Sequence, residues 1–179
     1  HLQGLTFTGS GTSQYEVKGG VQLDESKRLF GYVRVRDGEL QQLLALSNAN
    51  VPDVNGKLQA TIDLGGTSDS PRLDVKGSLE NTTIRDEVVG TATLDVGYGG
   101  RTIDIRTFNL PIKEGLIAGK GKADLDGITD IQLVASKVPV GTILPLVTSD
   151  INGQGNWNFI INVQGPTKSP KVEFSSEIE

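Results

Sequence analysis

Apolar residues recur at every second position along most of the chain. In segment 58–64, Leu58, Ile62 and Leu64 alternate with polar residues such as Asp63. Because successive side chains of a strand point to opposite faces, this alternation gives a sheet with one apolar and one polar face, which is typical of antiparallel strands. The spacing predicts an all-β fold of roughly ten strands. The same alternation occurs in segments 15–23, 33–36, 73–76, 92–96, 103–106, 131–133 and 157–164.

Turn and helix signals divide these strands. Segments 97–100, 113–115 and 126–127 carry the Gly-containing sequences of hairpin connections. Segment 39–46 places leucines at helical spacing, with Asp37 positioned to cap its start, and segment 140–147 is similar but contains Pro145. Both segments are too short to be stable alone, so we expect them to pack on the sheet.

An internal repeat joins the two halves of the chain. We interpret residues 1–179 as one β-repeat domain with copies at about 29–80 and 129–179. A chance similarity between two hairpins is the alternative. The matches at an offset of 99 are Gly66/Gly165, Ser70/Ser169 and Pro71/Pro170, and those at an offset of 100 are Leu44/Leu144 and Leu46/Leu146.

The composition excludes several kinds of chemistry. The chain has no cysteine, and its one histidine is His1, so we expect no thiol nucleophile, Cys-ligated zinc or buried histidine base. A net charge of −5 argues against binding to nucleic acid. We therefore expect neither an enzyme nor a cofactor or metal. The chain lacks methionine, and we expect it to be a segment of a longer protein.

Several local motifs resemble functional sites without matching them. Segment 115–122 has glycines and lysines like a phosphate loop, but its spacing is wrong and no Ser or Thr follows the lysine, so we expect a strand or bulge. Segments 124–127 and 150–153 lack the Glu of a calcium loop and predict turns instead. Segment 81–83 matches a glycosylation acceptor by chance. A hydrolase that uses a pair of carboxylates stays an open alternative, although most Asp and Glu residues occupy the polar positions of alternating strands.

The first copy of the repeat resembles a known family. The pattern is similar to the repeating unit of TamB-like proteins in the AsmA-like family, whose turn is typically Gly-Thr-x-x-x-Pro. The resemblance covers about residues 29–174, although the second copy departs from it at Gly165-Pro166-Thr167. The residues that carry it are Gly56, Leu58, Ala60, Ile62, Leu64, Gly66, Thr67, Ser70, Pro71, Leu73, Val75, Gly77 and Leu79.

The resemblance implies an elongated sheet curled into a U-shaped trough, or β-taco, with an aliphatic interior and a polar exterior. Family members are bacterial envelope proteins that are anchored in the inner membrane and extend across the periplasm. They are thought to carry phospholipid acyl chains or to assist outer-membrane protein assembly. On this basis we expect a periplasmic segment whose partners are acyl chains, an outer-membrane barrel of the TamA type and neighbouring repeats.

The alternation then predicts which side chains line the trough. Aromatic residues are only 5% of the chain, so the lining is mainly Leu, Ile and Val, which suits fluid acyl chains. The predicted lipid-binding residues are Leu58, Ile62, Leu64, Leu73, Val75, Leu94, Val96, Ile103, Ile105, Ile131, Leu133, Trp157, Phe159, Ile161, Val163, Val172 and Phe174. The residues predicted for the opposite face are Gln59, Asp63, Asp74, Lys76, Asp95, Asp104, Arg106, Asn158 and Asn162.

Two other interpretations fit the same pattern. The chain could be a scaffold or chaperone segment that pairs with client strands, such as those of autotransporters, through an open sheet edge. It could also be a closed sandwich in which the apolar face is simply the core.

Overall fold

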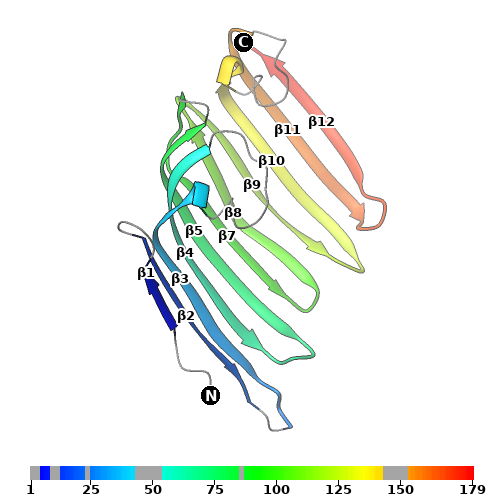
Figure 1. Cartoon of the computed structure of the whole chain (residues 1–179). Helices are drawn as coiled ribbons and strands as arrows, with labels where there is room; N and C mark the ends of the chain where they lie inside the picture. Colours follow the sequence, from blue (N-terminus) through cyan, green and yellow to red (C-terminus); the bar gives the residue numbers. More distant parts are fainter. Residues whose placement is uncertain (1–4, 9–12, 23–24, 43–53, 85–86, 143–152) are drawn as a thin grey trace.

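The computed structural model shows an all-β chain, in which twelve strands form a single antiparallel sheet (Figure 1). The structure describes residues 5–8, 13–22, 25–42, 54–84, 87–142 and 153–179. The predicted fold class is therefore confirmed. The strands are β1 (Leu5–Thr8), β2 (Gln14–Val21), β3 (Leu29–Glu39), β4 (Val54–Gly66), β5 (Pro71–Ile84), β6 (Glu87–Val88), β7 (Ala92–Gly99), β8 (Thr102–Ile112), β9 (Gly115–Asp124), β10 (Ile128–Pro139), β11 (Asn156–Pro166) and β12 (Lys171–Ile178).

The strands follow one another across the sheet in chain order. The single departure is β6, which pairs with the end of β5 before β7 continues along the same side of β5. Short turns close the hairpins at 100–101, 113–114 and 125–127, where the sequence predicts them. Because each strand pairs with its neighbours in the chain, the sheet grows in one direction from β1 to β12.

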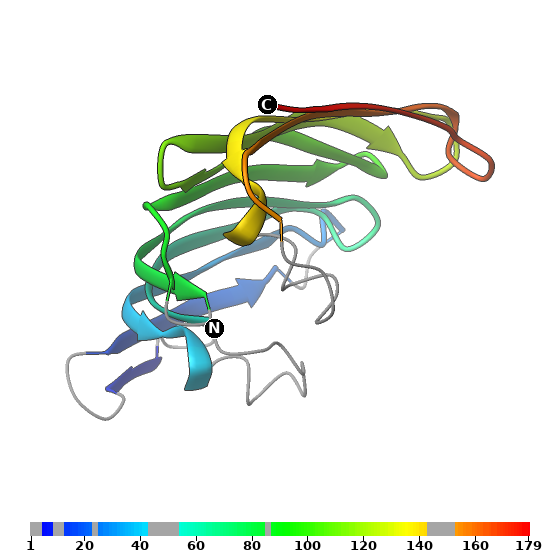
Figure 2. The same ribbon diagram turned by 90° about the horizontal axis from the view of Figure 1, so that it is seen from above.

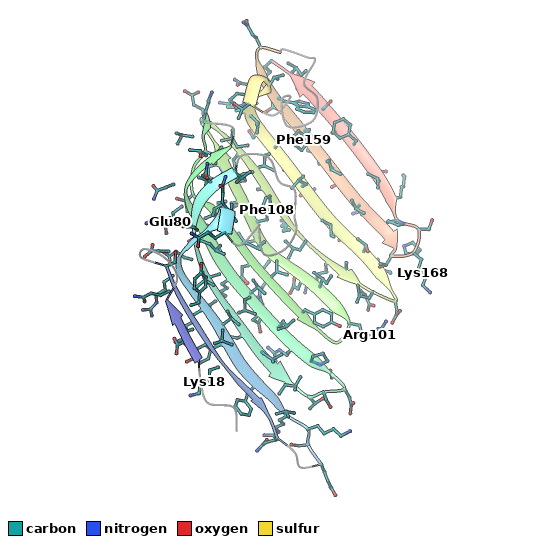
Figure 3. The ribbon with its side chains drawn as sticks, in the orientation of Figure 1. Lys18, Glu80, Arg101, Phe108, Phe159 and Lys168 are labelled. Atoms are coloured by element: carbon teal, nitrogen blue, oxygen red, sulfur yellow. The ribbon has the colours of Figure 1, made fainter. Side chains whose placement is uncertain are left out.

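The connections gather at two opposite rims. One rim, here called the turn rim, joins β2–β3, β4–β5, β7–β8, β9–β10 and β11–β12, and it includes Arg101 and Lys168 (Figure 3). The other, called the helical rim, has helical turns at 40–42 and 140–142 (Figure 1). The remainder of the two predicted helices, at 43–46 and 143–147, lies outside the described residues, as do the repeat pairs Leu44/Leu144 and Leu46/Leu146.

Matching bulges bend β3 and β10 close to the helical rim. The register shifts between Val35 and Gly38 in β3 and between Ala135 and Val138 in β10. Each bulge contains a non-glycine residue with left-handed backbone, namely Asp37 with φ 50° in one copy and Lys137 with φ 50° in the other. A bulge bends its strand and increases the local twist. Both copies of the repeat therefore bend at equivalent positions close to the helical rim.

Side-chain amides from the neighbouring strands support these bulges. The Asp37 N–H donates to Gln59 Oε1 at 3.3 Å, and the Lys137 N–H donates to Asn158 Oδ1 at 2.7 Å. The Asp37 carboxylate accepts a hydrogen bond from Gln59 Nε2 at 3.0 Å. The prediction that Asp37 caps a helix is therefore wrong, because its backbone belongs to the β3 bulge and its carboxylate is bound to β4.

The two copies of the repeat also share a turn. Gly66 and Gly165 have φ of 82° and 107°, values that strongly favour glycine. At Gly66, a Cβ atom would lie 2.3 Å from the Ser70 carbonyl oxygen, so no other residue fits without a shift of the backbone. Pro71 begins β5 and Pro170 directly precedes β12, so both prolines lie at the turn rim, at the matching positions that the repeat predicts.

The sheet is curled, and its apolar face lies inside the curl. Seen from above, the strands bend at the end that bears the helical turns (Figure 2). At this end Val89, Ile112, Ala135 and Val138 form a cluster in which each side chain is at most 3% exposed. Lys113, which follows Ile112 in the β8–β9 turn at the helical rim, is by contrast exposed. The described core therefore lies along the helical rim and leaves most of the sheet without a thick interior.

The left-handed bulge at Lys137 predicts an unusual response to glycine. In Lys137→Gly the loss of the left-handed strain offsets the added backbone entropy of the unfolded chain, so the free energy of unfolding should stay constant or rise by about 1 kcal/mol. Lys120→Gly, at a β9 residue without left-handed backbone, should lower it by about 1 kcal/mol. Urea unfolding measures both variants, and equal losses in the two would show that the bulge is unstrained.

Candidate functional site

The strand register places aliphatic side chains in continuous rows across the sheet. Residues directly opposite one another in antiparallel strands share a face. One row passes through direct pairs from β2 to β12 and is interrupted only in β9, where Gly121 takes the position. The members of this row are Val17, Val33, Ile62, Val75, Val96, Ile105, Gly121, Ile131, Val163 and Val172.

Every residue predicted to line the trough lies on this face, called here the apolar face. A second row includes Leu94, Leu133, Ile161 and Phe174, with Phe108 between the first two. A third includes Leu64, Leu73 and Ile103, and the part of β11 opposite the β10 bulge adds Trp157 and Phe159. The residues predicted for the opposite face all lie there.

The sequence prediction missed part of the apolar face because of strand bulges. In β8 the register shifts between Ile105 and Phe108, so Phe108, Leu110 and Ile112 occupy the same face as Ile105. A strict alternation counted from Ile105 assigns them to the wrong face. The sequence signal that could have found them is that Phe108, Leu110 and Ile112 alternate with one another. Other aliphatic residues that the prediction missed on this face include Val17, Val21, Leu29, Val33, Val35, Leu79, Ile117, Val138 and Ile178.

Little of the described protein covers this face away from the helical rim. Val172, Phe174 and Ile178 of β12 are 62%, 57% and 62% exposed, and Leu94 in the centre of the sheet is 40% exposed. The accessible surface is 11528 Å², whereas a compact monomer of 19.0 kDa has about 8,400 Å². The chain therefore exposes more total surface than a compact monomer, and a group of exposed apolar side chains on one face is typical of a binding surface.

The apolar face has the dimensions of a long band. Along β4 it runs from Leu58 to Leu64, which is about 20 Å at roughly 3.4 Å per residue. Across the sheet from β2 to β12 it extends about 43 Å at roughly 4.8 Å per strand. A flexible apolar ligand could therefore lie along the strands or across them.

Aromatic rings mark the end of the band nearest β12. The Trp157 and Phe159 ring centroids lie 5.1 Å apart in an edge-on arrangement, and those of Phe159 and Phe174 lie 6.3 Å apart. Phe159 is labelled in Figure 3 on β11, and Phe108 is labelled nearer the middle of the sheet. Trp157 Nε1 is buried and has no hydrogen-bond partner among the described residues.

The opposite face, called the polar face, carries a network of ion pairs. Arg106 of β8 donates from Nη1 to Asp74 Oδ1 at 2.8 Å and from Nε to Asp95 Oδ1 at 2.6 Å. Lys76 lies 3.5 Å from Asp95 in the same network. The hydrogen bond from Arg106 is the main reason that the pKa of the Asp74 carboxyl lies below its ordinary value. This network joins β5, β7 and β8 across the water-facing surface.

The hollows of the surface lie on the polar face. One of about 680 Å³ is lined by side chains such as Lys120, Gln132 and Asn162, and another of about 520 Å³ is lined by Arg34, Arg36 and others. Both are shallow spaces between long polar side chains. Their linings consist mainly of polar-face residues, although Val35, Leu94 and Ile105 of the apolar face also contribute.

The motifs that only resemble functional sites are ordinary local structure. Segment 115–122 lies within strand β9, as predicted. In the β9–β10 turn, Asp124 Oδ1 accepts the Asp126 N–H at 2.9 Å, which is the predicted Asx turn. Most of segment 150–153 lies outside the described residues. Among the described residues no cluster of His, Cys, Asp or Glu could hold a metal ion, and no helix is long and apolar enough to span a membrane.

Comparison with known proteins adds no relative. No family model, curated protein or solved structure matches the chain. The apolar face and the resemblance of the repeat are therefore the features that bear on function.

The Arg106 network predicts an acid-sensitive stability. Because the pKa of Asp74 in the folded protein lies below the unfolded value of about 3.9, its contribution is complete above that pH and is lost as the pH falls through the folded value. In Arg106→Gln this contribution is reduced. The melting temperatures of wild type and variant should differ most at neutral pH and converge as the pH falls through the folded pKa of Asp74. If the two melting temperatures differ by the same amount at every pH, the Arg106–Asp74 pair does not contribute to the pH dependence of stability.

Proposed function

We propose that this chain is a segment of a hydrophobic conduit that carries phospholipid acyl chains between the inner and outer membranes. The observation that carries the proposal is the continuous apolar face, which spans the sheet from β2 to β12 and stays largely uncovered by described residues. With the family resemblance, it supports a periplasmic segment of an inner-membrane-anchored protein, acting in a translocation and assembly module with an outer-membrane barrel.

The dimensions and chemistry of the face suit acyl chains. Its width of about 20 Å exceeds the roughly 15 Å that acyl chains of one leaflet occupy in a bilayer. Transfer of each CH₂ from water to this face would contribute about 0.8 kcal/mol. This attraction is non-directional, so a chain could slide from one row to the next without breaking specific bonds. The polar face, with its ion pairs, would face water.

The topology argues against a closed sandwich. A sandwich needs a second sheet that packs on the apolar face at about 10 Å. All the described strands belong to one sheet, and Phe174 and Val172 on that face are largely exposed. A lipid would provide the missing cover.

A second candidate function is assembly of outer-membrane proteins by strand pairing. The specific observation in its favour is β12, a regular edge strand that no described strand covers. Crosslinks between β12 and an outer-membrane barrel or its client, formed in cells, would support this function. Lipid crosslinks on the apolar face without such protein crosslinks would favour the conduit.

A charge on the apolar face should block lipid binding. Ile161 lies on the apolar face of β11, and Ile161→Asp would place a carboxylate in the path of the acyl chains at a cost of roughly several kcal/mol. Native mass spectrometry of the purified chain should show at least a tenfold loss of bound phospholipid. In the full-length protein the same change should block lipid movement.

Asn162→Asp provides the matched control, since Asn162 lies on the polar face of the same strand. It should bind lipid like wild type. Ile161→Asp should keep the β-sheet circular dichroism, because water can hydrate an open trough. Unfolding of this variant would indicate a closed core, and normal lipid binding by the folded variant would exclude the conduit for this segment.

A further inference from the structure

The polar face carries a group of apolar side chains near the helical rim. Ala118, Val134 and Ile160 lie directly opposite one another in β9, β10 and β11, at positions that alternate with those of the apolar face. Leu116, which precedes Ala118 by two positions in β9, shares their side of the sheet. Leu116 and Ile160 are 40% and 39% exposed. These residues, called here the outer patch, form a contiguous apolar surface on strands that are each paired on both sides.

The first copy of the repeat is charged or polar where the second copy has the outer patch. The β2–β3–β4 ladder corresponds to the β9–β10–β11 ladder, because β3 and β10 carry matching bulges and pair with equivalent neighbours. In the first copy Arg34 Nη1 lies 3.9 Å from Glu16 Oε2, and both side chains are exposed. The fold therefore does not require apolar side chains at these positions. The equivalent pairs are Gln14/Leu116, Glu16/Ala118, Arg34/Val134 and Thr61/Ile160.

A hollow and an available cation lie beside the outer patch. The hollow has a volume of about 370 Å³, and its lining includes Ala118 and Val134. Lys120 lines the same hollow and is exposed, and its side chain has no ion-pair or hydrogen-bond partner among the described residues. The other cation of the hollow, Arg106, is already bound by two carboxylates. Lys120 is therefore the charge that a partner on the outer patch can meet.

We propose that the outer patch binds an amphipathic helix of a partner protein, with the apolar stripe of the helix on the patch and an acidic residue of the helix beside Lys120. The width of the patch favours a helix. Strands β9 to β11 span about 10 Å at roughly 4.8 Å per strand, and an α-helix with its side chains is about 10–12 Å wide. A helix with one apolar stripe is also an element that commonly packs on the face of a sheet. A side chain of the stripe can enter the hollow beside Val134.

The border of the outer patch argues against a second sheet or a second copy of this chain as the occupant. Asn109 and Ser175 flank the patch at its own level in β8 and β12, and Gln132 and Asn162 lie toward the turn rim. A partner surface of about 800 Å², which a stable interface usually needs, would also bury these polar groups. Their burial without new hydrogen bonds is unfavourable. A helix covers the apolar residues and leaves the polar border hydrated. Because the outer patch and the apolar face lie on opposite sides of the sheet, helix binding does not depend on the proposed lipid binding.

Two designed peptides test the charge at the site. Each is a helix of about 18 residues with a stripe of leucines, flanked by glutamates in one peptide and by lysines in the other. In fluorescence anisotropy at low ionic strength, the wild-type chain should bind the glutamate peptide about fivefold more tightly than the lysine peptide. Lys120→Glu should reverse this order. Equal binding of the two peptides, or the same order in Lys120→Glu as in wild type, would overturn the proposal.

The first copy of the repeat supplies the matched variant. Ala118→Glu, Val134→Arg and Ile160→Thr together install the residues that the first copy carries, so this triple variant should keep the β-sheet circular dichroism. It should bind the glutamate peptide about tenfold more weakly than wild type, and should retain the wild-type amount of bound phospholipid. If the triple variant does not fold, Ile160→Thr alone should weaken peptide binding about threefold.

Peptide binding by the folded triple variant that equals the binding by wild type would overturn the proposal, because the peptide would then lie elsewhere on the chain. A wild-type dimer in sedimentation equilibrium that the triple variant abolishes would identify a second copy as the occupant. Binding of wild type to phosphatidylcholine vesicles that the triple variant abolishes would identify a membrane surface. Either result would also overturn the partner helix.

Discussion

Cross-strand pairing in a single register is the constraint on which the rest of this structure depends. A shift of one residue in any strand would move its aliphatic side chains to the water-facing side. The pairs from Val17 through Ile62 to Val172 show that no such slip occurs across the described sheet. Adjacent strands of the sheet are also adjacent in the chain, and at the turn rim short turns fix the register of β4–β5, β7–β8, β9–β10 and β11–β12.

Bulges modify this regular ladder where the sheet must bend. In β3 and β10 the extra residue turns the strand toward the helical rim, and an amide side chain from the next strand binds the free N–H of the bulge. The buried cluster around Val138 lies at that bend. Elsewhere the sheet has one layer, and its stability comes from the ladder, half-buried side chains and the ion pairs of the polar face. Such a structure leaves a wide apolar band available to a ligand.

The functional proposal follows from this division of the two faces. Arg106, Asp74 and Asp95 bind one another on the side that faces water, where their charges remain hydrated. On the other side Leu94 and Phe174 find no comparable cover among the described residues. A ligand held by non-directional apolar contacts matches that surface better than a ligand that needs fixed polar contacts.

The alternation of residues by itself determined the all-β class, the two faces and most of the apolar face, because side-chain direction in a strand depends only on position in the chain. It also located the hairpin turns and the equivalent prolines. Only the tertiary structure showed that Phe108 and Leu110 belong to the apolar face, and that Asp37 supports a bulge rather than a helix. A bulge depends on the register of the partner strand, which no local pattern specifies. Whether the apolar face is covered or open likewise depends on what lies across it, and that is decided by the path of the whole chain.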